Sequence, residues 1–153
     1  MPSQRILFTC SSGGHLEEML QLKKIIAKNN SYLFTETNQK DLKDFGKVYT
    51  VNQINRKEKN FFMNFIKLFF LSRKIIKKIR PSVIVSTGAL VTVPMCIIGK
   101  FMHIKIIYIE SFARIDKPSL TGKIMYKFAD VFVVQWKDLL KYFPKAKFWG
   151  GIF

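Results

Sequence analysis

Near its start the chain contains the stretch ILFTCSSGGHLEEMLQLKKII, residues 6–26. Residues 6–10 are a short apolar run, and two serines and two glycines follow it directly. Beyond the glycines, apolar residues return every three or four positions with charged residues between them, which is the spacing of an amphipathic helix. A strand, a glycine turn and a helix in this order predict the first βα unit of a parallel sheet.

The same alternation continues along the chain. Strands are expected at residues 31–34, 48–51, 83–85, 105–109 and 131–134, and helices at residues 59–79, 120–128 and 137–142, with an apolar helix around Pro94. The run at residues 83–85 is wholly β-branched, as in a strand that is buried on both faces. No repeat or linker divides the chain. The sequence therefore predicts a single Rossmann-like α/β domain over residues 1–153, a parallel sheet with helices on both faces.

The composition is strongly basic, with 26 Lys and Arg against 10 Asp and Glu and a net charge of +16. Such a charge favours polyanionic partners, either nucleic acid or an anionic membrane surface. Cys10 and Cys96 are too few for a disulfide framework and are expected to be buried thiols in a reducing compartment. No signal-peptide pattern precedes Ser11, and no run reaches the roughly 18 apolar residues of a membrane span. A soluble or peripheral protein is expected.

A glycine loop follows the first strand, at the edge of the sheet where open α/β folds bind ligands. It consists of Ser11, Ser12, Gly13, Gly14 and His15. Glycines allow close backbone approach, and hydroxyls and a helix start favour an anion, so a phosphate or diphosphate is the expected ligand. A simple turn with a serine cap is the alternative. His15 is a candidate phosphate donor or base, or else a surface histidine at a helix start.

Polar residues follow other strands at the same edge. Thr87, Gly88 and Ala89 form a second small-residue loop that can admit an anionic or sugar ligand. Glu110 ends a strand and is a candidate general base or hydroxyl-binding group, with helix capping or loop pairing as the alternative. Glu36 stands where a ribose-binding acid follows in nicotinamide folds, but the glycine spacing is not GxGxxG. Without HExxH, paired CxxC or DxD, no metal or cofactor is expected.

A long helical pattern combines basic and aromatic residues. Between Arg56 and Arg80 stand nine Lys or Arg residues and one acid, Glu58. An apolar stripe is expected from Phe62, Phe65, Ile66, Phe69, Ile76 and Ile79, widened by Phe61, Leu68, Phe70 and Ile75. This wide arc with a lysine-rich flank is typical of a helix in a membrane interface, so residues 58–80 are predicted to form a basic amphipathic membrane-contact helix. The expected contacts are Phe61, Phe62, Phe65, Phe69, Lys67, Arg73 and Lys74. The alternatives are a helix whose extra aromatics meet a partner protein and an ordinary core helix.

Four segments together resemble a known family. They are TCSSGGHLEEMLQL at residues 9–22, FTET at 34–37, SVIVSTGALVTVP at 82–94 and YIES at 108–111. They resemble the acceptor-side, membrane-anchoring subunit of the two-subunit UDP-GlcNAc transferase of dolichol-linked oligosaccharide synthesis. Bacterial capsule and exopolysaccharide counterparts, called glycosyltransferase enhancer subunits, share this pattern. The resemblance covers nearly the whole chain, and SSGGHLEEM is its most specific part.

The resemblance implies the N-terminal, acceptor-binding half of a GT-B glycosyltransferase, as in the enzyme that adds GlcNAc to lipid I. Residues 149–153 would then begin the interdomain hinge. The chain would be a non-catalytic or half-catalytic subunit, inactive without a catalytic partner that carries the nucleotide-sugar site. Residues 11–15 would receive the diphosphate of a lipid-linked sugar acceptor, residues 87–89 would face it, and Glu110 would lie near the acceptor hydroxyl.

The resemblance also bears on location. Eukaryotic relatives carry an N-terminal transmembrane segment that this sequence lacks, so the helix at residues 58–80 or the partner would provide attachment. Peripheral association with the cytoplasmic face of the cell membrane is expected.

Two other functions remain open. A basic nucleic-acid-binding protein would use the same helix on phosphates, although its aromatics share the apolar stripe with Ile and Leu instead of standing apart as stacking platforms. Nucleic acid is therefore not expected among the partners. A self-sufficient small nucleotide-binding α/β enzyme would bind a free nucleotide at the glycine loop.

Overall fold

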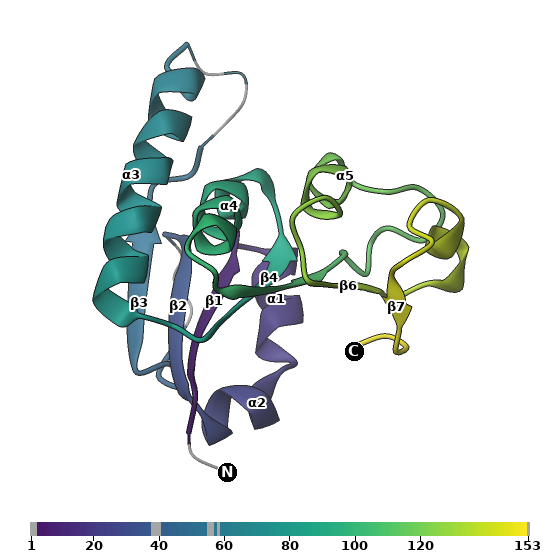
Figure 1. Cartoon of the computed structure of the whole chain (residues 1–153), viewed down its shortest axis with the longest axis horizontal. Coiled ribbons are helices and arrows are strands. Elements are labelled where there is room, and N and C mark those ends of the chain that lie inside the picture. Colours follow the sequence, from purple (N-terminus) through teal and green to yellow (C-terminus); the bar gives the residue numbers. More distant parts are fainter. Residues whose placement is uncertain (1–2, 38–40, 55–56, 58, 153) are drawn as a thin grey trace.

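A computed structural model of the chain describes residues 3–37, 41–54, 57 and 59–152. Across these residues, seven strands form one parallel sheet in the order β3-β2-β1-β4-β5-β6-β7 (Figure 1). They are β1 (Arg5–Cys10), β2 (Asn30–Glu36), β3 (Lys47–Val51), β4 (Val83–Gly88), β5 (Lys105–Ile109), β6 (Val131–Val134) and β7 (Lys147–Phe148). The order reverses between β1 and β4, where doubly wound sheets bind their ligands. The predicted Rossmann-like α/β class is confirmed.

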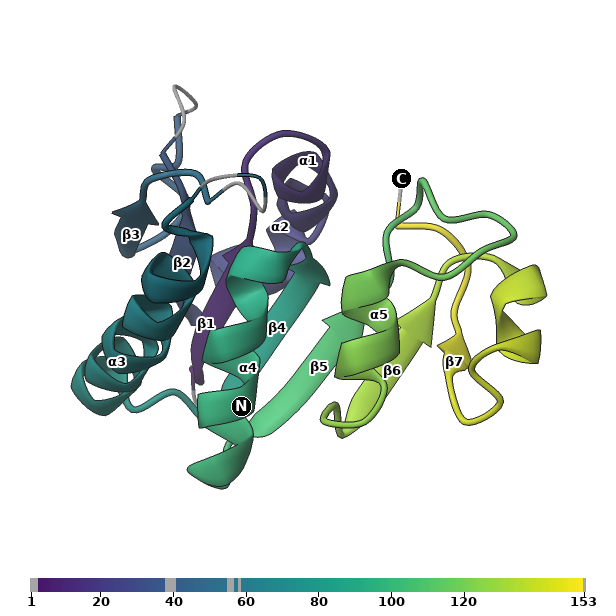
Figure 2. The same cartoon turned by 90° about the horizontal axis from the view of Figure 1, so that it is seen from above.

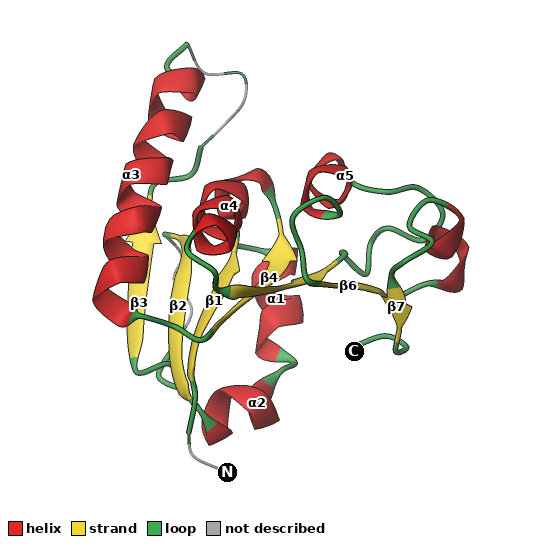
Figure 3. Cartoon of the chain, viewed as in Figure 1, coloured by secondary structure: helices red, strands yellow, loops and turns green. Residues whose placement is uncertain are grey.

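Helices cover both faces of this sheet (Figures 2 and 3). One face carries α1 (Gly14–Leu20) and α2 (Lys23–Lys28); the other carries α3 (Phe61–Ile79), α4 (Val93–Phe101) and α5 (Leu120–Met125). Two 3-10 helices are η1 (Leu90–Thr92) and η2 (Lys137–Lys141). The helical pattern expected from residue 16 to residue 26 is thus divided between α1 and α2 by a turn at residues 21 and 22.

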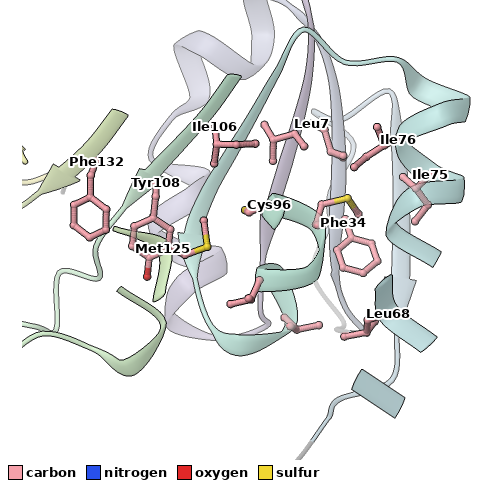
Figure 4. Close-up of a cluster of buried hydrophobic side chains, with 14 of the residues drawn as sticks. Leu7, Phe34, Leu68, Ile75, Ile76, Cys96, Ile106, Tyr108, Met125 and Phe132 are labelled. Atoms are coloured by element: carbon pink, nitrogen blue, oxygen red, sulfur yellow. The ribbon is translucent and has the colours of Figure 1, made fainter. Parts of the chain in front are cut away.

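The core lies in two layers, one on each side of the sheet. Leu7 belongs to the layer beneath α3, α4 and α5, and its neighbour Phe8 to the layer beneath α1 and α2. Successive side chains of a strand point to opposite faces, so β1 is buried on both sides. Figure 4 shows the first layer, which includes Leu7 of β1, Ile106 of β5 and Ile76 of α3. This packing makes the central strands a rigid base for the loops at their carboxyl ends.

Helix α3 faces the sheet differently from the expected stripe. Phe62 and Ile66 were expected on that stripe, yet they are 73% and 41% exposed. The buried residues of α3 lie in its later turns and are Leu68, Ser72, Ile75, Ile76 and Ile79. In Figure 1 the N-terminal half of α3 rises past the carboxyl ends of β2 and β3, so no sheet lies beneath its first turns. The helix begins at Phe61, and Glu58, where the predicted membrane-contact helix starts, lies outside the described residues.

Candidate functional site

The carboxyl ends of β1, β4 and β5 bring the predicted loops together around a cavity of about 370 Å³. Its lining comes from the starts of three helices and from the loop after β5. The lining residues are His15, Ala89, Leu90, Ser111, Ala113, Arg114, Ser119, Leu120 and Thr121. We refer to this hollow as the polar cavity. Its volume is within the range of small-molecule sites in proteins.

His15 is locked to the loop after β4 by two reciprocal hydrogen bonds. Its Nδ1 lies 2.8 Å from the carbonyl oxygen of Thr87, and the Thr87 hydroxyl donates to the carbonyl oxygen of His15 at 2.8 Å. A carbonyl oxygen can only accept, so Nδ1 is the donor in this contact. The other ring nitrogen, Nε2, is then the atom that can accept a proton. The structure thus joins two predicted loops and sets the tautomer of His15.

The backbone after β4 has an unusual conformation beside this histidine. Gly88 has a φ of +114°, and a Cβ added to it would lie 3.0 Å from Cε1 of His15 and 3.1 Å from the Tyr108 hydroxyl. Ala89 has φ 73° and ψ 155°, a region that residues other than glycine rarely adopt and that costs about 1–3 kcal/mol. Only a glycine at position 88 leaves room for the His15 ring.

The glycine loop after β1 is closed on one side and open on the other. Ser12 donates from its amide nitrogen and its hydroxyl to Oε2 of Glu36, at 3.2 and 3.1 Å, while Ser11 is buried. Glu36, considered above as a ribose-binding acid, holds the loop in this structure. Gly13 and Gly14 are exposed, and a Cβ added to either would meet no atom within 4 Å. The backbone of these two glycines is therefore exposed, and its role in binding a diphosphate stays a prediction.

Glu110 is fully buried at the end of β5 and contacts the start of α5. Its carboxylate accepts hydrogen bonds from the amide of Ser111 at 3.0 Å and from the amide and hydroxyl of Ser119 at 3.2 and 2.8 Å. The Ser119 hydroxyl in turn accepts from the Gly122 amide at 2.8 Å and caps α5. A Cβ on Gly122 would lie 1.8 Å from Oε2 of Glu110. These contacts match the capping alternative, and a catalytic role for Glu110 stays a prediction.

Glu18 is a further buried carboxylate, one turn after His15 on α1, that the sequence patterns did not indicate. It is 4% exposed, and its Oε1 accepts from the Ser111 hydroxyl at 2.8 Å and from the Phe112 amide at 3.1 Å. Burial raises the pKa of Glu18 above its usual value. Glu18 therefore ties α1 to the loop that follows β5, so that His15 and this loop keep one relative position.

Gln135, also missed, extends this network to the end of the chain. Its Nε2 donates to Oε2 of Glu18 at 3.3 Å and to the carbonyl oxygen of Glu110 at 3.0 Å. Its Oε1 accepts from the amide of Ile152 at 3.0 Å. The sequence signal was a polar residue directly after β6, at the same edge of the sheet as the predicted loops.

Arg114 supplies positive charge at the polar cavity. It is exposed, and its amide donates to the carbonyl oxygen of Ser111 at 2.9 Å, so the loop after β5 turns tightly at this position. Guanidinium groups are suited to bind phosphate, so Arg114 is the candidate countercharge for a phosphate-bearing ligand in this cavity. Among the described residues, no group of three or more His, Cys, Asp and Glu gathers in a metal-binding arrangement.

The aromatic residues predicted to contact a membrane fall into two rows on α3. Phe61, Phe65 and Phe69 are half-buried, and their rings contact one another in succession with centroids 5.6 Å apart. Phe62 lies on the neighbouring exposed row, which consists of Phe62, Met63, Ile66 and Phe70. The predicted basic contacts Lys67, Arg73 and Lys74 are all exposed. Within the described parts of the chain, no helix has the length and apolar character needed to span a bilayer.

A parallel sheet whose strand order reverses beside a cavity at its carboxyl edge is typical of Rossmann-like α/β proteins. Solved structures agree on this fold. MurG from Acinetobacter baumannii matches with a TM-score of 0.69 at 16% identity, over 87% of this chain and 41% of that chain. UDP-N-acetylglucosamine 2-epimerase from Rickettsia bellii matches with a TM-score of 0.71 at 11% identity, over 98% of this chain and 45% of that chain. The chain thus spans less than half the length of these neighbours, and at such identities they show the fold alone.

Sequence comparison identifies the family. Residues 34–152 match the family described as oligosaccharide biosynthesis protein Alg14 like, and the chain belongs to this family. The UDP-N-acetylglucosamine transferase subunit ALG14 of Mus musculus is 25% identical, over 98% of this chain and 83% of that protein. The Schizosaccharomyces pombe subunit is 43% identical over 75 residues, which are 46% of this chain and 36% of that protein. The resemblance inferred from the four sequence segments is confirmed.

Proposed function

We propose that this chain is the acceptor-binding subunit of a two-component glycosyltransferase in polysaccharide biosynthesis. It binds a lipid-diphosphate-linked sugar at the membrane and recruits or activates a catalytic partner that carries the nucleotide-sugar site. The names of its relatives support a subunit role, because they are called transferase subunits. The observation that carries the proposal is the polar cavity, which His15 and Arg114 line and which lies at the start of α1, directly after the exposed Gly13 and Gly14.

The diphosphate is proposed to lie over Gly13 and Gly14, where the backbone is open, with the Arg114 guanidinium as its countercharge. In the transfer step, the acceptor hydroxyl oxygen bonds to the anomeric carbon of the donor sugar, and the bond from that carbon to the nucleoside diphosphate breaks. The hydroxyl proton must pass to a base. Nε2 of His15 is suited to take it, because Nδ1 donates to the Thr87 carbonyl oxygen and Nε2 is left as the accepting nitrogen.

Membrane contact is proposed for the exposed row of α3. Four apolar side chains there, with Lys67 and Lys74 beside them, suit insertion among anionic headgroups. Each basic residue near such a surface contributes about 1 kcal/mol to binding. Because the N-terminal half of α3 rises past the edge of the sheet that holds the polar cavity, this contact would bring a lipid-linked acceptor to the site (Figure 1). The chain would then be peripheral, on the cytoplasmic face where nucleotide sugars are available.

Transfer assays with separate and combined subunits test the proposal. A nucleotide sugar such as UDP-GlcNAc and a lipid-diphosphate-linked monosaccharide are supplied to this chain alone, to its candidate catalytic partner alone, and to both. We expect transfer that appears, or rises sharply, only with both. Full activity from the partner alone would make this chain dispensable, and activity from this chain alone would make it a complete enzyme; either result contradicts the proposal.

The variant Gly14→Val tests the placement of the diphosphate. A Cβ at this position meets no atom within 4 Å, so folding and partner binding should persist. The side chain would cover the backbone that the diphosphate is proposed to approach, so we expect transfer by the complex to fall by at least roughly 10²-fold. Full activity, with circular dichroism and partner capture both unchanged, would contradict this placement.

A further inference from the structure

A second cavity, of about 420 Å³, adjoins the polar cavity and has a different character. Its walls come from α3, η1, α4 and α5, and all of its lining side chains are apolar. The lining residues are Phe61, Phe65, Phe69, Leu90, Val93, Ile97, Leu120 and Ile124. We refer to this hollow as the apolar groove. Leu90 and Leu120 also line the polar cavity, so the two hollows meet at these leucines.

The three helices around the apolar groove lie side by side over one face of the sheet (Figure 2). On α3 the groove is bounded by the half-buried aromatic row, whose rings contact one another and form a continuous wall. On α5 it is bounded by Leu120, which is 53% exposed although it stands at the centre of the two hollows. The groove therefore carries apolar surface that the fold itself leaves uncovered.

The chemistry of the walls restricts what this groove can bind. The side chains of Phe, Leu, Val and Ile offer no hydrogen-bond donor or acceptor, so a sugar or nucleotide would lose its hydrogen bonds to water there without replacement. A hydrocarbon chain gains favourable free energy when it enters such a groove, and each CH₂ removed from water tightens binding roughly fourfold. Apolar walls of this size are therefore suited to a hydrocarbon chain.

We propose that the apolar groove binds the first part of the hydrocarbon chain of the acceptor lipid. This inference rests on the proposed function, in which the diphosphate lies over Gly13 and Gly14 with Arg114 of the polar cavity as its countercharge. A chain attached to that diphosphate would pass Leu90 and Leu120, follow the wall made by Phe61, Phe65 and Phe69, and leave beside the exposed row of α3. The groove thus recognises the lipid itself and does more than bring the protein to a bilayer.

The test measures binding of soluble lipid diphosphates to the full chain by isothermal titration calorimetry, without membranes or detergent and at fixed ionic strength. The probes are inorganic diphosphate, geranyl diphosphate and farnesyl diphosphate, which carry no, two and three isoprene units. We expect geranyl diphosphate to bind on the order of tenfold more tightly than inorganic diphosphate, and farnesyl diphosphate at least as tightly as geranyl diphosphate.

Two matched variants test whether the hydrocarbon chain of the probe binds in the apolar groove. Phe65→Asn places a neutral polar group in the wall of the apolar groove, on a half-buried position that does not line the polar cavity. Most buried residues of α3 lie in its later turns, so folding should persist. Phe65→Asn should remove most of the tenfold gain and leave the affinity for inorganic diphosphate unchanged. Phe62→Asn makes a similar change on the exposed row outside the groove and should leave the whole series unchanged.

The outcomes separate this inference from the function on which it rests. If inorganic diphosphate binds but the isoprene units add nothing, the groove proposal is overturned and the diphosphate site stands. An equal gain in wild type and Phe65→Asn also overturns it, because the hydrocarbon chain then binds elsewhere. If Phe65→Asn lowers binding to anionic phospholipid vesicles without changing the isoprenoid series, the groove takes bilayer lipid and the proposal is wrong. If no diphosphate binds at all, the proposed diphosphate site fails, and this inference fails with it.

Discussion

Gly88 is the position where a single added methyl group should have the clearest effect. A Cβ there would lie 3.0 Å from Cε1 of His15 and 3.1 Å from the hydroxyl of Tyr108. Tyr108 is fully buried and its ring stacks on Phe132 with centroids 5.0 Å apart, so it cannot move aside. The side chain that must yield is His15, which would then lose its hydrogen bond to Thr87.

The size of the effect follows from two terms. A residue other than glycine at a φ of +114° costs about 1–3 kcal/mol, and an overpacked contact typically costs about 1–3 kcal/mol more. We therefore expect Gly88→Ala to lower the free energy of unfolding by about 2–6 kcal/mol, a large part of the roughly 5–15 kcal/mol of a native domain. Displacement of His15 should also reduce transfer by the complex by roughly 10²-fold.

Urea unfolding followed by far-ultraviolet circular dichroism measures the stability, with Gly14→Ala as the matched control. Gly14 opens α1, and a Cβ there meets no atom within 4 Å. Alanine favours a helix over glycine by up to about 1 kcal/mol, so Gly14→Ala should unfold at the same or a higher urea concentration than the wild type. The reasoning is refuted if Gly88→Ala is as stable as the wild type, or if the two variants are destabilised equally.

Three further predictions concern the membrane face and the buried ionisable groups. Phe62→Glu with Phe70→Glu should abolish cosedimentation with anionic vesicles without changing stability, because both side chains are more than 70% exposed; unchanged cosedimentation would place membrane contact elsewhere. Burial raises the pKa of Glu18 above its ordinary value of 4.5, so the stability that Glu18 contributes is present below pH 4.5 and is lost as pH rises through the folded-state pKa. In urea titrations the wild type should therefore lose stability relative to Glu18→Gln as the pH rises above 4.5, and a difference independent of pH would contradict this assignment. Burial raises the pKa of the Cys10 and Cys96 thiols to about 12, so iodoacetamide at about pH 8 should label them only after unfolding; labelling of the native chain would show that they are accessible.

The fold class, and the edge of the sheet at which ligands bind, could both be predicted from the sequence. The apolar run at residues 6–10, the glycines after it and the helical spacing beyond them are local patterns, and each depends on residues within a few positions of one another. Once the elements alternate as strand and helix, a parallel sheet follows, and its ligands bind at the carboxyl edge. For this reason the loops at residues 11–15 and 87–89 could be named in advance.

The orientation of α3 could not be predicted in the same way. Its sequence carries more than one apolar row, and periodicity alone cannot say which row meets the sheet. The structure shows that Leu68, Ile75 and Ile79 are buried while Phe62 is exposed, because the helix extends beyond the strands it covers. The split of the aromatics into an exposed row and a groove wall depends on where α4 and α5 lie.

The sequence by itself determined the α/β class, the family and the glycine loop, since all three depend on short-range patterns. Only the tertiary structure decided which polar groups act together. Glu18 bonds to Ser111, 93 residues away, and to Gln135, 117 residues away, and no local pattern links residues so far apart. Likewise Leu90 and Leu120 become the junction of the polar cavity and the apolar groove only when η1 and α5 lie beside each other on the folded sheet. Contacts of this kind depend on the distance between side chains in space, which the order of residues does not specify.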